Sequence, residues 1–389
     1  MTRSPAVDRF PALRVFVLID ALGWEVVRNF PFLEGELSVR MPLTTVLGYS
    51  SGAIPAILTG QVPSKTGRWN LLRYDPATSP FRWLKWCRGL PDRLVNNRYV
   101  RRLVREVGRR VLGLGPLFEC SVSPKILPYF DWVEKGNIYT TGGIPGAISV
   151  FDRLEELQIP YRVYSYHDCS DADICLQASR DIEQRKAGFY FLYLCEVDHF
   201  LHVHRNDHTE IAARLADYET QLRKVFGAAL RCDSRAELTV ISDHGMTPVN
   251  NYYDLLSEIE KLGLKMPEQY LAVYDSTMAR YWFFDESARV AVGSLLEHAS
   301  CGRILSDQEL ERLGILFPDR RYGELIFLLD PGWLFARSDF NGVGWQPAGM
   351  HGYHPSDNQS DAIYLSNKTP VTNPKTILDV YRCFLNGIE

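Results

Sequence analysis

The chain has 389 residues, of which 46% are hydrophobic and 23% charged, and its formal net charge is -4. This length and composition are enough for a full hydrophobic core, in one large domain with insertions or in two domains. The mildly acidic balance gives no overall positive field, so we do not expect a nucleic-acid polymer as a partner. The longest apolar run near the start, Val15–Ile19, is far shorter than the roughly 20 residues that a membrane span needs.

The cysteines are scattered and none of them forms a C-x-x-C pair. No run at the amino terminus resembles a signal peptide. Both features predict a protein of the reducing cytoplasm, in which thiols stay free. The eight cysteines are Cys87, Cys120, Cys169, Cys175, Cys195, Cys232, Cys301 and Cys383.

Three continuous apolar runs each lead to an acidic residue. Runs of this kind, rich in aliphatic and aromatic side chains, are typical of buried parallel strands. Polar residues that follow such strands gather at one edge of the sheet. The runs are Leu13–Ile19 before Asp20, Phe189–Cys195 before Asp198, and Glu237–Ser242 before Asp243 and His244.

Helical patterns separate these strands. Residues Gly52–Leu58 and Thr209–Leu230 have apolar positions at helical spacing. Strands that alternate with helices predict a doubly wound α/β sheet, an α/β/α sandwich, with ligands bound beyond the carboxyl ends of the strands. Two stretches, 75–146 and 250–341, interrupt the alternation. We interpret them as inserted cap segments of a single domain that spans residues 1–389.

Several side chains of the types that bind metal ions lie near these predicted strand ends. Asp243 and His244 are adjacent in S-D-H-G-M, where Gly245 permits a tight turn. Asp198 and His202 are four residues apart, so one helical turn would direct both to the same ion. The full candidate set is Asp20, Ser50, Asp198, His202, Asp243, His244 and His351, the last in a glycine-flanked loop.

Ser50 is the candidate nucleophile, because it stands where a loop should give way to a helix. The N–H groups at a helix start can hold a phosphoryl oxygen. A serine hydroxyl needs activation at neutral pH, and no histidine occurs in the first 166 residues to supply a local base. This favours activation by a metal ion. Ser51 is the near alternative, and either serine could simply cap the helix.

These motifs resemble the alkaline phosphatase superfamily, and within it the nucleotide pyrophosphatase/phosphodiesterase branch. Ser50 lies nine residues before Thr59-Gly60, as the nucleophile of that branch does, and Y-D-P follows at Tyr74. The resemblance implies two divalent cations, with zinc expected and manganese as the alternative. It assigns one ion to Asp20, Asp243 and His244 with the nucleophile, and the other to Asp198, His202 and His351. It also implies a phosphoseryl intermediate and a small phosphate ester or diester as the substrate.

The sequence departs from the branch at two points. The nucleophile is usually threonine in the diesterases, and serine occurs in the phosphatases, so a phosphomonoesterase or phosphotransferase with the same metal site remains an alternative. A non-catalytic binding module on the same fold is an alternative of another class. Asn70 lies one position out of register with an asparagine that touches a phosphate oxygen in the diesterases, and it is a candidate substrate-binding residue.

The segment Arg98–Arg110 (R-Y-V-R-R-L-V-R-E-V-G-R-R) predicts a basic amphipathic helix. Such a helix could be a lid or could contact the anionic surface of a membrane. The alternative is the solvated face of a helix in the first insertion.

Overall fold

The computed structural model describes residues 12–114, 122–165, 169–340 and 345–386. A six-stranded sheet with the order β2-β16-β7-β1-β6-β5 lies at its centre. The four strands β7, β1, β6 and β5 are parallel, whereas β16 is antiparallel to both of its neighbours. The strands are β1 (Arg14–Ile19), β2 (Val39–Leu43), β5 (Tyr161–Tyr164), β6 (Phe189–Leu194), β7 (Glu237–Ile241) and β16 (Ala362–Ser366).

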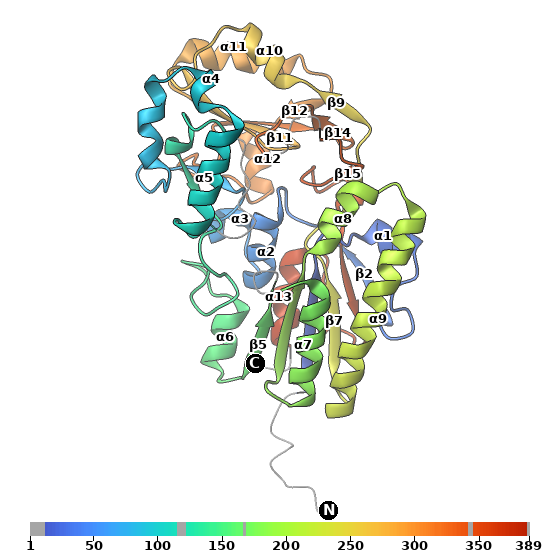
Figure 1. Cartoon of the computed structure of the whole chain (residues 1–389). Coiled ribbons are helices and arrows are strands. Elements are labelled where there is room, and N and C mark those ends of the chain that lie inside the picture. Colours follow the sequence, from blue (N-terminus) through green and yellow to red (C-terminus); the bar gives the residue numbers. More distant parts are fainter. Residues whose placement is uncertain (1–11, 115–121, 166–168, 341–344, 387–389) are drawn as a thin grey trace, which may run out of the picture.

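Helices cover both faces of this sheet (Figure 1). Alternate residues of β1 point to opposite faces, so that Val15 and Val17 join one apolar core and Phe16 and Leu18 join the other. This arrangement confirms the predicted α/β/α sandwich. The first core is completed by α1 (Trp24–Asn29), α7 (Asp171–Glu183), α8 (Glu196–His204) and α9 (His208–Cys232), and the second by α2 (Ser50–Thr59), α6 (Val150–Glu156) and α13 (Val380–Leu385).

A second, smaller sheet lies beyond one end of the central sheet (Figure 1). It is antiparallel, with the order β10-β11-β13-β12, and belongs to the segment interpreted as the second insertion. Its elements are β10 (Tyr270–Tyr274), β11 (Met278–Phe283), β12 (Gly302–Ile304) and β13 (Leu325–Leu329), with α10 (Leu255–Lys261), α11 (Glu286–Glu297) and α12 (Asp307–Arg312).

The two segments interpreted as insertions pack against each other, and together they are called the cap here. The rings of Phe130 and Trp282 lie 5.1 Å apart between centroids, and both belong to one apolar cluster. In contrast, Tyr139 and Ile144 of the first segment pack on the central sheet. The boundaries 75–146 and 250–341 therefore stay an interpretation. The first segment contributes a 3-10 helix (Arg82–Gly89), α4 (Asp92–Val95), α5 (Arg98–Arg110) and β4 (Phe130–Trp132). Strand β4 pairs with β3 (Leu72–Tyr74), which lies just before this segment.

Short elements connect the cap to the central sheet. They are α3 (Pro63–Thr66), β8 (Thr247–Pro248), β9 (Asn251–Tyr253), β14 (Trp333–Phe335) and β15 (Gly349–Met350).

None of the helices in the described ranges is long and apolar enough to span a bilayer.

Candidate active site

The register of the parallel strands brings the candidate residues together. Ile19 at the end of β1 lies level with Leu194 of β6, and Leu18 lies level with Ile241 of β7. The residues that follow these strands therefore emerge at the same edge of the sheet. Asp20 follows β1, Asp198 lies in the first turn of α8 after β6, and Asp243 follows β7.

The first group of potential ligands consists of Asp20, Asp243 and His244, and all three are buried. Their ligand atoms lie within 4.8 Å of one another. His244 Nε2 is 3.5 Å from Asp20 Oδ1 and 3.2 Å from Asp243 Oδ2. One cation could therefore contact all three side chains.

Neighbouring groups orient these ligands. The N–H groups of Ala21 and His244 donate to Asp243 Oδ1 at 3.2 and 3.0 Å, while the buried Oδ2 accepts no hydrogen bond. His244 Nδ1 lies 2.9 Å from the Gly245 carbonyl oxygen, which leaves Nε2 directed at the carboxylates. A ligating histidine commonly donates its other ring N–H in this way. Gly245 is required here, because a Cβ would lie 2.1 Å from the Gln359 carbonyl oxygen.

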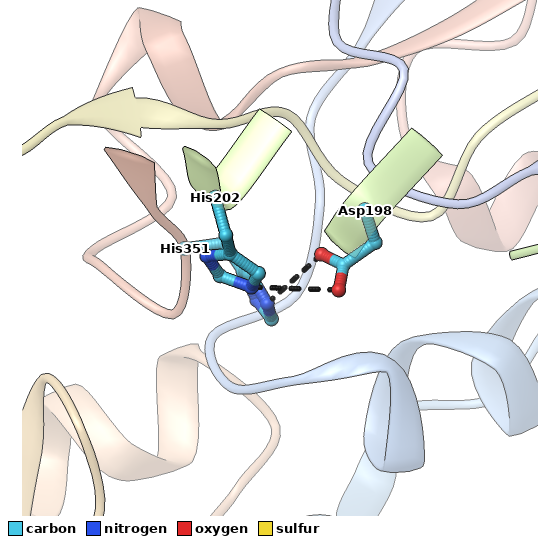
Figure 2. Close-up of side chains that lie close together, drawn as sticks. All are labelled: Asp198, His202 and His351. Atoms are coloured by element: carbon cyan, nitrogen blue, oxygen red, sulfur yellow. Dashed lines mark ion pairs between the residues drawn. The ribbon is translucent and has the colours of Figure 1, made fainter. Parts of the chain in front are cut away.

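The second group consists of Asp198, His202 and His351, whose side chains point toward one another in Figure 2. Asp198 Oδ2 is 3.4 Å from His202 Nε2, and Asp198 Oδ1 is 3.4 Å from His351 Nε2. His202 Nδ1 lies 2.8 Å from the Gly349 carbonyl oxygen, again with Nε2 left for a ligand. The Asp198 side chain is 26% exposed, so this group is the more open to solvent.

Ser50 is the first residue of α2 and lies beside the first group. Its Oγ is 3.3 Å from Asp20 Oδ1 and 3.1 Å from His244 Nε2. The Ser51 hydroxyl instead donates to the Trp69 carbonyl oxygen at 2.7 Å and is buried. The geometry thus separates the two serines, with only Ser50 in contact with the potential ligands.

The two groups form one site. The rings of His244 and His351 stack with centroids 3.9 Å apart and an angle of 14° between their planes. The structure therefore brings Asp20, Ser50, Asp198, His202, Asp243, His244 and His351 into one cluster at the sheet edge.

The electrostatics of this cluster favour the binding of positive charge. Burial raises the pKa of Asp20 well above its usual value, and the nearby carboxylates of Asp243 and Asp198 raise it further. Burial also lowers the pKa of His351, assisted by the neighbouring His244. The pKa of Asp198 is lowered, although burial opposes this, because His202 lies beside it. Two of the three carboxylates also have a buried oxygen that accepts no hydrogen bond, Asp198 Oδ1 and Asp243 Oδ2. Three carboxylates with two such oxygens fit two divalent cations.

Tyr193 is a site residue that the sequence does not reveal. Its hydroxyl donates to Asp20 Oδ2 and so fixes that carboxylate. In the sequence, this residue is one of several aromatic residues in the run that forms β6. Its register opposite Leu18 is a tertiary feature.

Tyr49 and Thr277 are two further residues that the sequence does not reveal, and they connect the cap to both halves of the site. The Tyr49 hydroxyl accepts from the Thr277 N–H at 3.1 Å and lies 2.9 Å from Thr277 Oγ1. Thr277 Oγ1 donates to the Gly352 carbonyl oxygen at 2.9 Å. Gly352, next to His351, has φ +91°, and a Cβ there would lie 2.8 Å from Thr277 Oγ1. Thr277 thus fixes the residues that adjoin Ser50 and His351.

Asn70 is fully buried. Its Nδ2 lies 3.4 Å from Asp275 Oδ2, and its Oδ1 accepts no hydrogen bond. Asp275 in turn pairs with Arg280 at 2.6 Å. Contact between Asn70 and a substrate stays a prediction.

Comparison with known proteins decides the family. The profile of the type I phosphodiesterase / nucleotide pyrophosphatase family matches residues 15–354. The chain belongs to this family. Its members are phosphodiester and pyrophosphate hydrolases that use two divalent metal ions, and the family lies within the alkaline phosphatase superfamily, as the motifs indicated.

Solved structures of this family share the fold. Murine ectonucleotide pyrophosphatase/phosphodiesterase 5 superposes with a TM-score of 0.68 at 15% sequence identity, and the human protein with 0.68 at 14%. An inactive variant of the murine protein in complex with AMP gives 0.67 at 16%. In each case the match covers 96% of this chain and 94% of the other. No curated protein sequence matches the chain.

Proposed function

We propose that this chain hydrolyses phosphodiester or pyrophosphate bonds of nucleotide-type substrates, with Ser50 as the nucleophile and the two ligand groups as the sites of two divalent cations. The observation that carries the proposal is the position of Ser50 Oγ, 3.1 Å from His244 Nε2 and 3.3 Å from Asp20 Oδ1. A hydroxyl held by potential metal ligands at a helix start is placed to attack phosphorus.

In the proposed reaction, Ser50 Oγ gives up its proton and forms a bond to phosphorus as the bond to the leaving oxygen breaks, and the leaving oxygen takes up a proton. The phosphoseryl intermediate keeps the remaining substituent of the substrate on phosphorus. Water then attacks the same phosphorus, returns a proton to Ser50 Oγ as the bond to serine breaks, and releases the phosphate monoester. When bound, the cations would lower the pKa of the attacking hydroxyl and neutralise charge that develops on the phosphoryl oxygens. Asp20, Asp243 and His244 would hold one cation beside Ser50, and Asp198, His202 and His351 would hold the other.

We propose zinc for both positions, because each group mixes histidine nitrogens with carboxylate oxygens, and manganese is the alternative. Elemental analysis of the purified chain tests this assignment. Zinc as the bound metal would support it, and manganese alone would replace it.

A nucleotide-type substrate is supported by the AMP complex of the murine relative. The test compares bis-p-nitrophenyl phosphate with p-nitrophenyl phosphate, and then nucleotide diesters with pyrophosphates. Faster hydrolysis of the diester is expected. Faster hydrolysis of the monoester would favour the phosphomonoesterase alternative, and turnover of neither substrate in the metal-loaded protein would favour the binding module.

The substitution Ser50→Ala separates catalysis from binding. Loss of the nucleophile should lower the hydrolysis rate by several orders of magnitude while the fold is kept. Ser51→Ala is the matched control, because it removes a hydroxyl from the same helix turn that bonds only to Trp69. Near-normal activity in Ser50→Ala, or loss of activity in Ser51→Ala alone, would contradict the assignment.

We also propose a cytoplasmic location. The seven cysteines of the described ranges are free thiols, while Cys120 lies outside those ranges. Free thiols support a reducing compartment. Cell fractionation tests this proposal, and recovery of the chain outside the cytoplasm would contradict it.

A further inference from the structure

We propose that the outer face of α5 docks the protein on an anionic membrane surface. The predicted helix forms over its full expected range, Arg98–Arg110. It lies at one side of the cap (Figure 1). The α5 face is defined here by its solvent-facing residues Arg98, Tyr99, Arg102, Leu103, Arg109 and Arg110.

Packing within the cap does not explain the composition of this face. The opposite side of α5 already contributes Val104 and Gly108 to the cap interior. Tyr99 is nevertheless 69% exposed and Leu103 is 55% exposed, on the side that faces water. The inner side of the helix therefore packs on the cap, and the outer side carries a second apolar stripe among its arginines.

The sequence around this helix is rich in exposed apolar side chains. Of the fourteen exposed large hydrophobic residues in the described ranges, five lie between positions 86 and 111. Trp86 is 61% exposed, Leu94 54% and Val111 74%. Concentration of such residues next to basic side chains is typical of segments that lie in the interface of a bilayer.

The charge of the segment is opposite to that of the remaining chain. Residues 82–111 hold ten of the 43 basic residues and only two of the 47 acidic ones, so the rest of the chain has 33 basic against 45 acidic residues. One of the two acids, Glu106, pairs with Arg110 at 3.0 Å. Such a local positive field is complementary to anionic lipid headgroups.

A bilayer fits this surface better than a nucleic acid does. Phosphate contacts alone account for most binding to nucleic-acid polymers, and they would leave Tyr99 and Leu103 in water. In a bilayer the same residues enter the boundary between headgroups and acyl chains while the arginines remain at the phosphate level. The α5 face, which has both basic and apolar residues, suits a position at this boundary.

The test uses the full chain and vesicles of phosphatidylcholine with and without phosphatidylserine, separated by sedimentation. We expect binding only to the phosphatidylserine vesicles, and weaker binding as salt is added. Each basic residue near an anionic surface contributes about 1 kcal/mol, so Arg102→Ala/Arg109→Ala should weaken binding roughly 30-fold. Tyr99→Ala/Leu103→Ala should weaken it as well.

The matched control is Arg180→Ala/Lys224→Ala, which removes two exposed basic residues from α7 and α9. This variant should bind the vesicles as the unaltered chain does, and every variant should hydrolyse a soluble diester at the same rate. The proposal is overturned if the chain does not sediment with phosphatidylserine vesicles at low salt. It is also overturned if the control weakens binding equally, or if the α5 face retains single-stranded RNA and no vesicles.

Discussion

Replacing Tyr193 with phenylalanine should weaken metal binding without opening a cavity. The Tyr193 hydroxyl donates to Asp20 Oδ2, and each residue is only 5% exposed, so water does not replace the lost donor. A hydrogen bond to a charged group contributes about 1.5 to 3 kcal/mol. That hydrogen bond also lowers the pKa of Asp20, so its loss lets a proton compete better with the cation. Outer residues of this kind change metal affinity by roughly 10- to 100-fold.

The assay is zinc affinity measured by competition with a chelator, for the metal-free Tyr193→Phe and unaltered chains. Tyr190→Phe is the control, because it removes a buried hydroxyl from the same strand that bonds to Ala187 and Asp181 instead. This control should lower the free energy of unfolding and leave the zinc affinity unchanged. An unchanged zinc affinity in Tyr193→Phe would refute the role of Asp20 as a fixed ligand.

Three further predictions concern pH, the cap contact and a buried ion pair. Burial lowers the pKa of His202, but the adjacent Asp198 outweighs burial and raises that pKa. In metal-free protein the protonation of His202 beside Asp198 therefore stabilises the fold below the ordinary histidine pKa, and this contribution is lost as pH rises through the raised pKa. The Tm of chelated protein should therefore fall as pH rises from the ordinary histidine pKa through the raised pKa, while that of loaded protein does not, and a chelated Tm that rises in this range would contradict the assignment. Thr277→Val removes hydrogen bonds to Tyr49 and Gly352 and should lower kcat about tenfold with KM unchanged. Thr277→Ser should restore kcat, and equal loss in both variants would argue against positioning. Asp275→Asn leaves the buried Arg280 without its carboxylate partner. It should lower the free energy of unfolding, measured in urea, by about 3 to 5 kcal/mol. Asp307→Asn breaks the more exposed pair of Asp307 with Arg320 and should lower the free energy of unfolding by less than about 1 kcal/mol. Equal losses in the two variants would refute the role of burial.

The central sheet could be predicted because its strands have a local signature. The apolar runs that end before Asp20 and Asp243 became β1 and β7 within a residue or two of the predicted bounds. Helical spacing likewise predicted α9, and four-residue spacing placed Asp198 and His202 on one face of α8. Such patterns depend only on residues that are near each other in the sequence. Once the buried strands form the central sheet, the candidate metal ligands that follow them lie at one edge of that sheet.

The cap and the residues that orient the ligands could not be predicted in the same way. The contact of Thr277 with Tyr49 joins residues 228 positions apart, and the contact of Tyr193 with Asp20 joins residues 173 apart. Neither pair has a spacing that a helix or strand would produce. The packing of Phe130 on Trp282, which unites the two inserted segments, is also a tertiary contact with no local pattern.

The number of metal ions bound per chain tests the central claim most directly. Native mass spectrometry of the zinc-loaded chain should show two ions, and Asp198→Asn should retain only the ion of Asp20, Asp243 and His244. Asp20→Asn should retain only the other. A chain that binds no ions, or that binds two in all three forms, would contradict the assignment of the two ligand groups.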